Sequence, residues 1–221
     1  MPRAFTETER QTIRRRLMET GRACFLRYGV YKTTIGDLTR PAGIAKASFY
    51  LFFRSKEELF VEVFLEEIPA MMDRLLDASF RATDDTREAL IRLMQAIVHE
   101  IETNEMSRMM LDDPAQLEKL AAGLDYQAIL AQSAAIFAPL IEAIVDAQAR
   151  GQIVPGDPLQ LVYSLGLIKL LPVSRDRISE TLYETLLDLL PRVIADGLTC
   201  PARRASAAVS DSTHKRGGKT Q

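Results

Sequence analysis

The chain contains only two cysteines, Cys24 and Cys200, among its 221 residues. Two cysteines are too few for a disulfide framework or a cysteine-rich zinc site. His99 has no second metal ligand at a suitable spacing, so we expect no metal sensor and no bound metal. The sequence also lacks a nucleophile motif, a phosphate-binding loop and any cluster of His, Cys and Asp. These absences argue against an enzyme, and no cofactor is expected.

Long apolar runs are missing as well. The most apolar stretch, residues 159–171, is interrupted by Ser164, Gly166 and Lys169, and it is shorter than the ~20 apolar residues that a membrane helix needs. Residues 1–16 are polar and rich in arginine, with no apolar run behind them, so they do not have the pattern of an export signal. We therefore expect a cytoplasmic protein without a membrane partner.

Charge is distributed unevenly along the chain. Residues 1–56 hold 12 Lys and Arg against 4 Asp and Glu, whereas residues 57–200 hold 11 against 25. Residues 201–221 are again basic, with 5 against 1. A basic first quarter on an acidic body indicates that one end meets a polyanion such as DNA, although a solvated basic face would have the same composition.

Helical periodicity recurs along the chain and strand patterns do not, which predicts an all-α protein. After residue 54 the expected helices cover 55–81 with a kink at Pro69, 84–102, a helix starting at Asp113, 125–150 with a kink near Pro139, 158–172 and 179–198. Residues 201–221 are small, polar and basic, and we expect them to form a disordered tail.

The first quarter of the chain has the pattern of a three-helix unit. Residues 13–28 place apolar side chains on one helical face and arginines 14–16 on the opposite one, and Gly29 ends this helix. Thr34 caps a short second helix, and residues 45–53 form a third after a glycine turn. Two short helices around a tight turn are the helix-turn-helix unit, whose second helix fits the major groove of DNA.

The start of the third helix carries the candidates for reading bases. Lys46 can donate to guanine acceptors or to a phosphate, and small alanine side chains on either side allow close approach. The hydroxyl of Tyr50 can reach a phosphate, and Lys56 adds a cation to the free backbone N–H groups of the helix that Ser55 opens. The alternative interpretation is that these are simply short helices of the core. Phe49, Phe52 and Phe53 are expected in the core in either case.

These residues resemble the N-terminal domain of tetracycline-repressor-type (TetR family) regulators over about residues 10–60. The resemblance is carried by Phe25, Tyr28-Gly29-Val30, Thr33-Thr34-Ile35, Asp37-Leu38, Ala42 through Phe53, and most specifically by Tyr50-x-x-Phe53-x-Ser55-Lys56-Glu57-Glu58-Leu59. Motif and resemblance together give these DNA-binding candidates: Thr33, Thr34, Ala45, Lys46, Ala47, Ser48, Tyr50, Leu51 and Lys56.

Four positions depart from the family pattern. Ala45 stands where a serine usually caps the helix, and Thr39 stands where alanine is usual. Pro41 removes a backbone donor near the end of the second helix, and Leu51 replaces a polar residue that often faces the phosphates. These departures affect the operator sequence rather than the fold.

The resemblance implies that the last two helices pair with their copies in a four-helix bundle. The sequence supports this independently, because these helices carry more apolar residues than one core needs. The candidates for the dimer interface are Leu161, Leu165, Ile168, Leu182, Leu186, Leu189 and Val193. Internal packing alone is the alternative.

The resemblance also implies a ligand site among the middle helices. Methionines and aromatic residues line adaptable apolar pockets, although they also fill ordinary cores. The ligand-binding candidates are Met94, His99, Met106, Met109, Met110, Tyr126 and Phe137.

The expected organisation has three parts: a helix-turn-helix domain over residues 1–56, a helical ligand-binding and dimerisation domain over 57–200, and the tail. The expected function is a homodimeric transcriptional regulator, most simply a repressor that a small apolar ligand releases from a double-stranded DNA operator. A constitutive or activating regulator of the same fold is the alternative.

Overall fold

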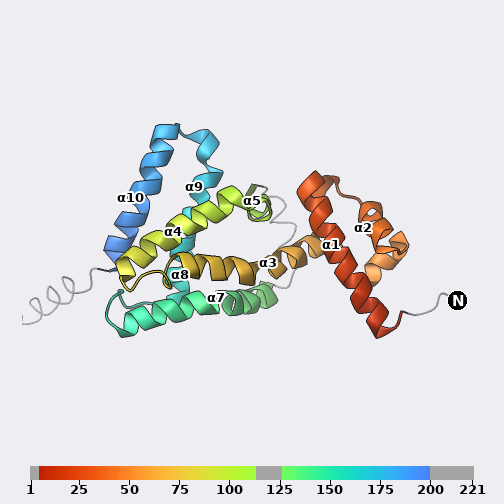
Figure 1. Cartoon of the computed structure of the whole chain (residues 1–221), viewed down its shortest axis with the longest axis horizontal. Coiled ribbons are helices and arrows are strands. Elements are labelled where there is room, and N and C mark those ends of the chain that lie inside the picture. The colour runs from red at the N-terminus through yellow and green to blue at the C-terminus, as the bar shows by residue number, and fades with distance from the viewer. Residues whose placement is uncertain (1–4, 113–125, 200–221) are drawn as a thin grey trace, which may run out of the picture. The chain divides into compact units, whose positions relative to one another are not determined.

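The structure, a computed structural model, describes the backbone of residues 5–112 and 126–199, and their side chains except those of 110–112 and 126–134. All regular structure in these residues is helical, so the expected all-α class is confirmed (Figure 1). The elements are α1 (Glu7–Lys32), α2 (Ile35–Ala42), η1 (Lys46–Leu51), α3 (Lys56–Ala78), α4 (Thr86–Thr103), α5 (Glu105–Asp112), α7 (Tyr126–Ala149), α8 (Pro158–Gly166), η2 (Leu167–Lys169), α9 (Leu170–Val173), η3 (Arg175–Arg177) and α10 (Glu180–Leu198).

Most helix ends lie where the capping residues predict them. Gly29 breaks α1 with a φ of 75°, and one further turn then continues to Lys32. Asp157 caps α8 through the backbone N–H groups of Leu159 and Gln160, and Ser179 caps α10. Among the described helices, none is long and apolar enough to cross a membrane.

Helix α5 was not expected from the sequence. The side chain of Asn104 accepts hydrogen bonds from the backbone N–H groups of Met106 (3.0 Å) and Ser107 (3.1 Å), and so caps a new helix immediately after α4. The helix expected to start at Asp113 and the tail of residues 201–221 lie outside the described residues.

The chain divides into two compact units. Unit 1 comprises residues 1–71 and 102–132, and unit 2 comprises residues 72–101 and 133–221. This division does not coincide with the boundary expected at residue 56, because the first part of α3 and helix α5 pack with the N-terminal helices. The expected boundary therefore remains a prediction about which segment folds alone.

Unit 1 has an aromatic core. Phe25 of α1 meets Phe60 of α3 edge to face at 5.4 Å between ring centroids, and Phe49 and Phe53 lie 5.8 Å apart. Met106 of α5 is buried in the same cluster. The core thus holds α2 and η1 against α1, α3 and α5.

Unit 2 is tied together by polar contacts between its helices. Arg74 of α3 binds Glu100 of α4 through two hydrogen bonds, of 2.8 and 3.3 Å. Thr86 donates to Gln152 at 2.8 Å. Between these contacts α4 buries Leu90, Leu93 and Met94 completely, so α4 forms the centre of this unit's core.

Candidate DNA-binding site

The start of α2 is held by a reciprocal capping box. The hydroxyl of Thr34 accepts from the backbone N–H of Asp37 at 3.3 Å, and the carboxylate of Asp37 accepts from the Thr34 hydroxyl at 2.6 Å and from its N–H at 3.0 Å. The hydrogen bond from the Thr34 side chain is the largest cause that lowers the pKa of Asp37, followed by the bond from the Thr34 backbone. The expected cap at Thr34 is therefore confirmed, and Asp37 stays ionised at neutral pH.

The third helix of the motif is a 3₁₀ element, η1, rather than an α-helix. Gly43 makes the turn before it with a φ of 73°, in the left-handed region that glycine adopts readily. Ala45 stands at the N-cap without a side-chain hydrogen bond, as its methyl group requires.

One edge of η1 is exposed and the other is buried. Phe49 and Phe53 are fully buried, as predicted, whereas Phe52 is only half-buried. The side chain of Tyr50 is 61% exposed and that of Leu51 is also exposed. The rest of the exposed edge is formed by Ala45, Lys46 and Ala47, with Ser48 half-buried beside them. The base-reading candidates are thus accessible or half-exposed, and their contacts with DNA remain predictions.

Thr33 was expected to contact DNA, and the structure contradicts this for its side chain. It is 1% exposed, and its hydroxyl donates to the carbonyl oxygen of Gly29 at 2.8 Å. The same carbonyl also accepts from the backbone N–H of Thr33 at 3.3 Å, so Thr33 caps the end of α1 with both groups. Its side chain therefore closes the end of α1 and is not available to DNA.

Lys56 was expected to be available to DNA, but it forms hydrogen bonds within the protein. Its ammonium donates to the carbonyl oxygens of Tyr31 (2.7 Å) and Thr33 (2.8 Å), so it joins the start of α3 to the end of α1. Lys56 is half-buried, and two of its three donors are used in these bonds. Its primary role in the free protein is structural, and any phosphate contact must use the remaining donor.

Two arginines of α1 hold the far end of η1, which sequence reasoning missed. Arg10 donates to the carbonyl oxygen of Leu51 at 3.2 Å, and Arg14 donates to that of Phe52 at 3.3 Å. Arg14 also forms an ion pair with Glu62 of α3 and lies over the ring of Phe53 at 4.6 Å. Arg14 was expected on a solvated face, and periodicity cannot show that a long side chain reaches back to a neighbouring element.

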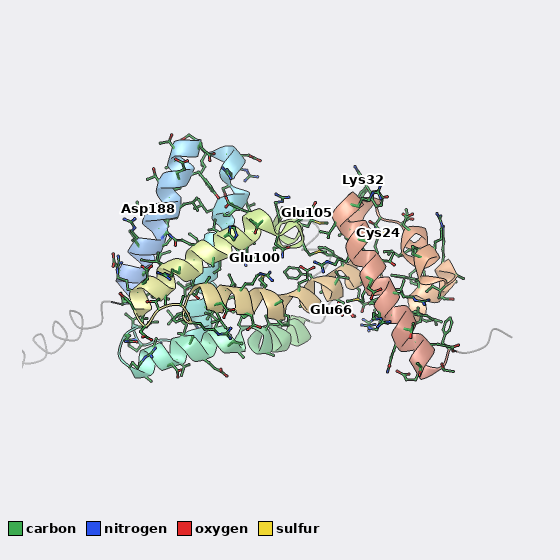
Figure 2. All side chains as sticks on the ribbon, viewed as in Figure 1. Cys24, Lys32, Glu66, Glu100, Glu105 and Asp188 are labelled. Atoms are coloured by element: carbon green, nitrogen blue, oxygen red, sulfur yellow. The ribbon has the colours of Figure 1, made fainter. Side chains whose placement is uncertain are left out.

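Exposed groups at the end of α1 extend the candidate surface. Tyr31 is 84% exposed, and Lys32 beside it is exposed at the last turn of α1 (Figure 2). Neither was among the sequence candidates, because α1 was expected to end at Gly29. They lie next to the carbonyl groups that bind Lys56 and to the capped start of α2.

The ligand candidates are not brought together as one set. Met94 is buried in unit 2 and His99 is exposed on α4, whereas Met106 is buried and Met109 half-buried in the core of unit 1. Phe137 of α7 meets Tyr163 of α8 edge to face at 5.9 Å. The side chains of Met110 and Tyr126 lie outside the described residues.

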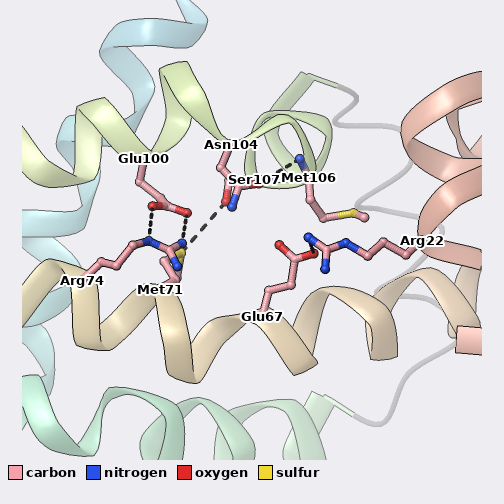
Figure 3. A network of polar contacts seen from close by, with 8 residues as sticks. All are labelled: Arg22, Glu67, Met71, Arg74, Glu100, Asn104, Met106 and Ser107. Carbon is pink, nitrogen blue, oxygen red and sulfur yellow. Dashed lines mark hydrogen bonds and ion pairs between the residues drawn. The ribbon is translucent and has the colours of Figure 1, made fainter. Parts of the chain in front are cut away.

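The region around α4 contains polar groups that the candidate set omits. Figure 3 shows Glu100 held by Arg74, and, in unit 1, Glu67 of α3 with Arg22 of α1 at 2.9 Å. Glu100 is buried, so its carboxylate is paired inside an otherwise apolar segment. A pattern of apolar spacing marks this position as core and does not reveal the charge there.

The dimer candidates fall into two groups. Leu182, Leu189 and Val193 of α10 are exposed, and Leu161 and Leu186 are half-buried. Leu165 and Ile168 are buried within the protomer, which corrects their assignment to an interface. The exposed apolar residues of this segment are instead Tyr163, Leu167 and Leu170. Leu165 and Ile168 lie on one apolar face, as the spacing predicted, but that face packs inside the protomer.

Known proteins are similar to this chain, most clearly around the site. Residues 17–63 match the family described as bacterial regulatory proteins, tetR family. The chain is 26% identical over 145 residues to the uncharacterized HTH-type transcriptional regulator YhgD of Bacillus subtilis, which covers 64% of this chain and 72% of that protein. It is 26% identical over 111 residues to the HTH-type transcriptional regulator TtgR of Pseudomonas putida, spanning 48% of this chain and about half (52%) of the relative.

Solved structures share the fold. The crystal structure of RolR in complex with its ligand resorcinol superposes with a TM-score of 0.61 at 16% identity, over 86% of this chain and 96% of RolR. A TetR family transcription regulator from Marinobacter aquaeolei superposes with a TM-score of 0.52 at 20% identity, over 87% and 98% of the two chains.

Proposed function

We propose that the chain is a DNA-binding transcriptional regulator of the TetR family. In this proposal it acts as a homodimeric repressor that a small molecule releases from its operator. The observation that carries the DNA-binding part is the exposed edge of η1, which follows a capped α2 and a glycine turn. Arg10 and Arg14 anchor the end of η1 from α1, so the reading edge is presented on a supported element.

A second copy of the chain is the partner that the C-terminal helices favour. Leu182, Leu189 and Val193 are exposed on α10, and Tyr163, Leu167 and Leu170 are exposed on the segment before it. Exposed apolar side chains such as these six favour association with a second protomer. A two-fold dimer would present two copies of η1 to the two half-sites of a pseudo-palindrome.

Unit 2 is the proposed ligand-binding part. Its core contains Met94 and a paired carboxylate, Glu100, among apolar side chains of α4. Apolar surroundings with a few fixed polar groups are typical of small-molecule sites. RolR, which shares the fold, was solved with the small aromatic ligand resorcinol, so a small and largely apolar ligand is the class that we propose.

Release requires that unit 2 influence unit 1, and the chain offers two continuous connections. Helix α3 begins in unit 1 and continues into unit 2 beyond Met71. Helix α4 belongs mainly to unit 2, and it leads through the Asn104 cap into α5, whose Met106 is buried in the core beneath the reading element. A ligand that shifts α4 would therefore disturb the packing of unit 1 directly.

The proposal is tested with DNA flanking the protein's own gene, because such regulators often control neighbouring genes. In vitro transcription from that promoter should fall when purified protein is added at physiological salt, and a ligand found by thermal stabilisation should restore it. Transcription that rises with added protein would overturn the repressor assignment. A ligand that stabilises the protein without restoring transcription would overturn the proposed release.

A further inference from the structure

Gly36 is the second residue of α2, and its own backbone does not require glycine. Among the described glycines, positive φ angles occur at Gly29, Gly43 and Gly151, so Gly36 has an ordinary backbone conformation that any residue adopts. Alanine is the better helix former at such a position. The reason for glycine must therefore lie in what surrounds it.

The space above Gly36 is filled by Lys46, the first residue of η1. A Cβ atom at residue 36 would lie 2.7 Å from Cε of Lys46 and 3.2 Å from its Nζ. The lysine stem thus lies directly on the first turn of α2, and Gly36 is buried in the free protein. Any side chain at residue 36 would displace Lys46 from this place.

The ammonium of Lys46 lies near α2, and its charge is not neutralised by an ion pair among the described residues. Asp37 is on the same turn, and Lys46 is one of the charges that lower its pKa, after the hydrogen bonds from Thr34 and the effect of Arg40. Within residues 5–112 and 126–199, the Lys46 ammonium makes no hydrogen bond and no ion pair within 4.0 Å. The N–H donors of Lys46 are therefore available to a ligand. Their position is set by the packing of the Lys46 stem on Gly36.

We propose that Gly36 is a positioning residue that holds Lys46 over α2, where the lysine serves as a sequence-independent contact to a DNA phosphate rather than as a reader of guanine. In a docked helix-turn-helix the first helix crosses the DNA backbone while the second enters the groove. An ammonium held on the first turn of α2 faces the backbone, whereas one extended from η1 would face base edges. This inference rests on the proposed DNA-binding function.

Two substitutions separate packing from charge. Gly36→Ala adds one methyl group whose close contacts are the Cε and Nζ atoms of Lys46, so the backbone should stay in place and this variant should fold normally. Lys46→Met keeps the stem and removes the charge. Gly197→Ala is the matched control, because a Cβ there meets no atom within 4 Å and the site is in α10.

The contact itself is measured in the free, full-length protein by NMR. We expect a nuclear Overhauser contact between the ε-methylene protons of Lys46 and the α-protons of Gly36. The contact of Lys46 with residue 36 should be lost in Gly36→Ala, whereas Gly197→Ala should retain it. A wild-type Lys46 with random-coil shifts and no such contact would overturn the inference whatever the protein does with DNA.

The role of the contact is measured with the tightest duplex of about 30 base pairs selected from a random library, its single-base variants and a random-sequence duplex. Lys46→Met removes one phosphate contact from each protomer of the dimer, so it should weaken binding to all of them equally, by about eighteenfold at roughly 0.2 M salt, and lower the slope of log K against log salt by about 1.8. Gly36→Ala should produce the same change, and the double variant should add nothing further.

The outcomes separate this inference from the proposed function. A Lys46→Met variant that relaxes preference at one base pair would make Lys46 a base reader and overturn the inference alone. If the losses of DNA affinity caused by Gly36→Ala and Lys46→Met add up in the double variant, Gly36 does not act by positioning Lys46. Wild-type protein that binds no duplex would overturn the proposed function, and the inference with it.

Discussion

Individual side chains of unit 1 divide into those that hold the motif together and those that remain exposed to a partner. Lys56, Arg10 and Arg14 belong to the first group, since each donates to backbone carbonyl oxygens of another element. Tyr50 and Tyr31 belong to the second, because their rings are exposed. The charge of a residue therefore does not by itself identify a DNA contact.

Lys56→Ala should destabilise the protein as well as weaken DNA binding. The substitution removes two charge-assisted hydrogen bonds to the end of α1, and the expected loss is about 1–3 kcal/mol of the free energy of unfolding. Urea unfolding measures it, with Lys32→Ala as the control, because Lys32 is an exposed lysine of the same unit. Equal stability of the two variants would show that the hydrogen bonds of Lys56 contribute nothing.

Neighbouring residues show what sequence reasoning could predict at this scale. Thr34 was recognised as a cap because its spacing to Asp37 is a local signal. Thr33, one residue earlier, was misassigned because its side chain is buried, and burial depends on how α1 and its neighbours pack. Local hydrogen bonds follow from sequence, whereas contacts such as that of Arg14 with Phe52 and Glu62 depend on tertiary packing.

Among the elements, η1 lacks a side-chain hydrogen bond at its N-cap. Ala45 stands at the N-cap with no side-chain hydrogen bond. Ala45→Ser should supply the missing acceptor and raise the free energy of unfolding by about 1 kcal/mol. Chemical denaturation measures this, and Ala47→Ser inside the same element should not stabilise. A destabilised Ala45→Ser variant would indicate that the cap geometry of η1 does not admit the bond.

The capping box of α2 makes a prediction about pH. The folded-state pKa of Asp37 is lowered by Thr34, so this stabilisation is present above the ordinary aspartate value of 3.8 and is lost as the pH falls through the lower folded value. Thr34→Val should raise the pKa of Asp37 towards 3.8 in an NMR titration. The difference in stability between wild type and variant should be larger at pH of about 7 than at about 3.

The control for this titration is Thr12→Val, because Thr12 donates to a backbone carbonyl within α1 and not to a carboxylate. An unchanged Asp37 pKa in Thr34→Val would contradict the assigned cause.

Helix boundaries were predictable where caps are local, as at Asp157 and Ser179. The α5 helix was missed because Asn104 was not recognised as a cap between two helices. The exposed face of this segment was also misplaced, because apolar spacing groups Leu165 with Ile168 but does not show whether their face packs inside the protomer or against a partner. Element identity thus follows from sequence more readily than the face that each element buries.

For the whole molecule, the proposed dimer depends on the exposed apolar groups of α10. Leu189→Glu should dissociate the dimer, because it would bury an unpaired charge in the interface, and it should leave the protomer folded, because residue 189 is exposed within it. Light scattering at micromolar concentration should give about twice the 24.8 kDa of one chain for wild type. Val145→Glu, at an exposed apolar residue of α7, is the control and should remain dimeric.

A wild-type monomer at that concentration would remove the basis for two linked reading elements. A dimeric Leu189→Glu variant would place the interface elsewhere on the protomer.

We propose that the chain reads DNA as a symmetric dimer through the exposed edge of η1. The most direct measurement is selection from a randomised duplex library at physiological salt, followed by sequencing of the bound fraction. A symmetric dimer should enrich a two-fold symmetric motif whose half-sites are separated by about one helical turn, or slightly more. An unenriched library, or a single asymmetric half-site, would contradict it.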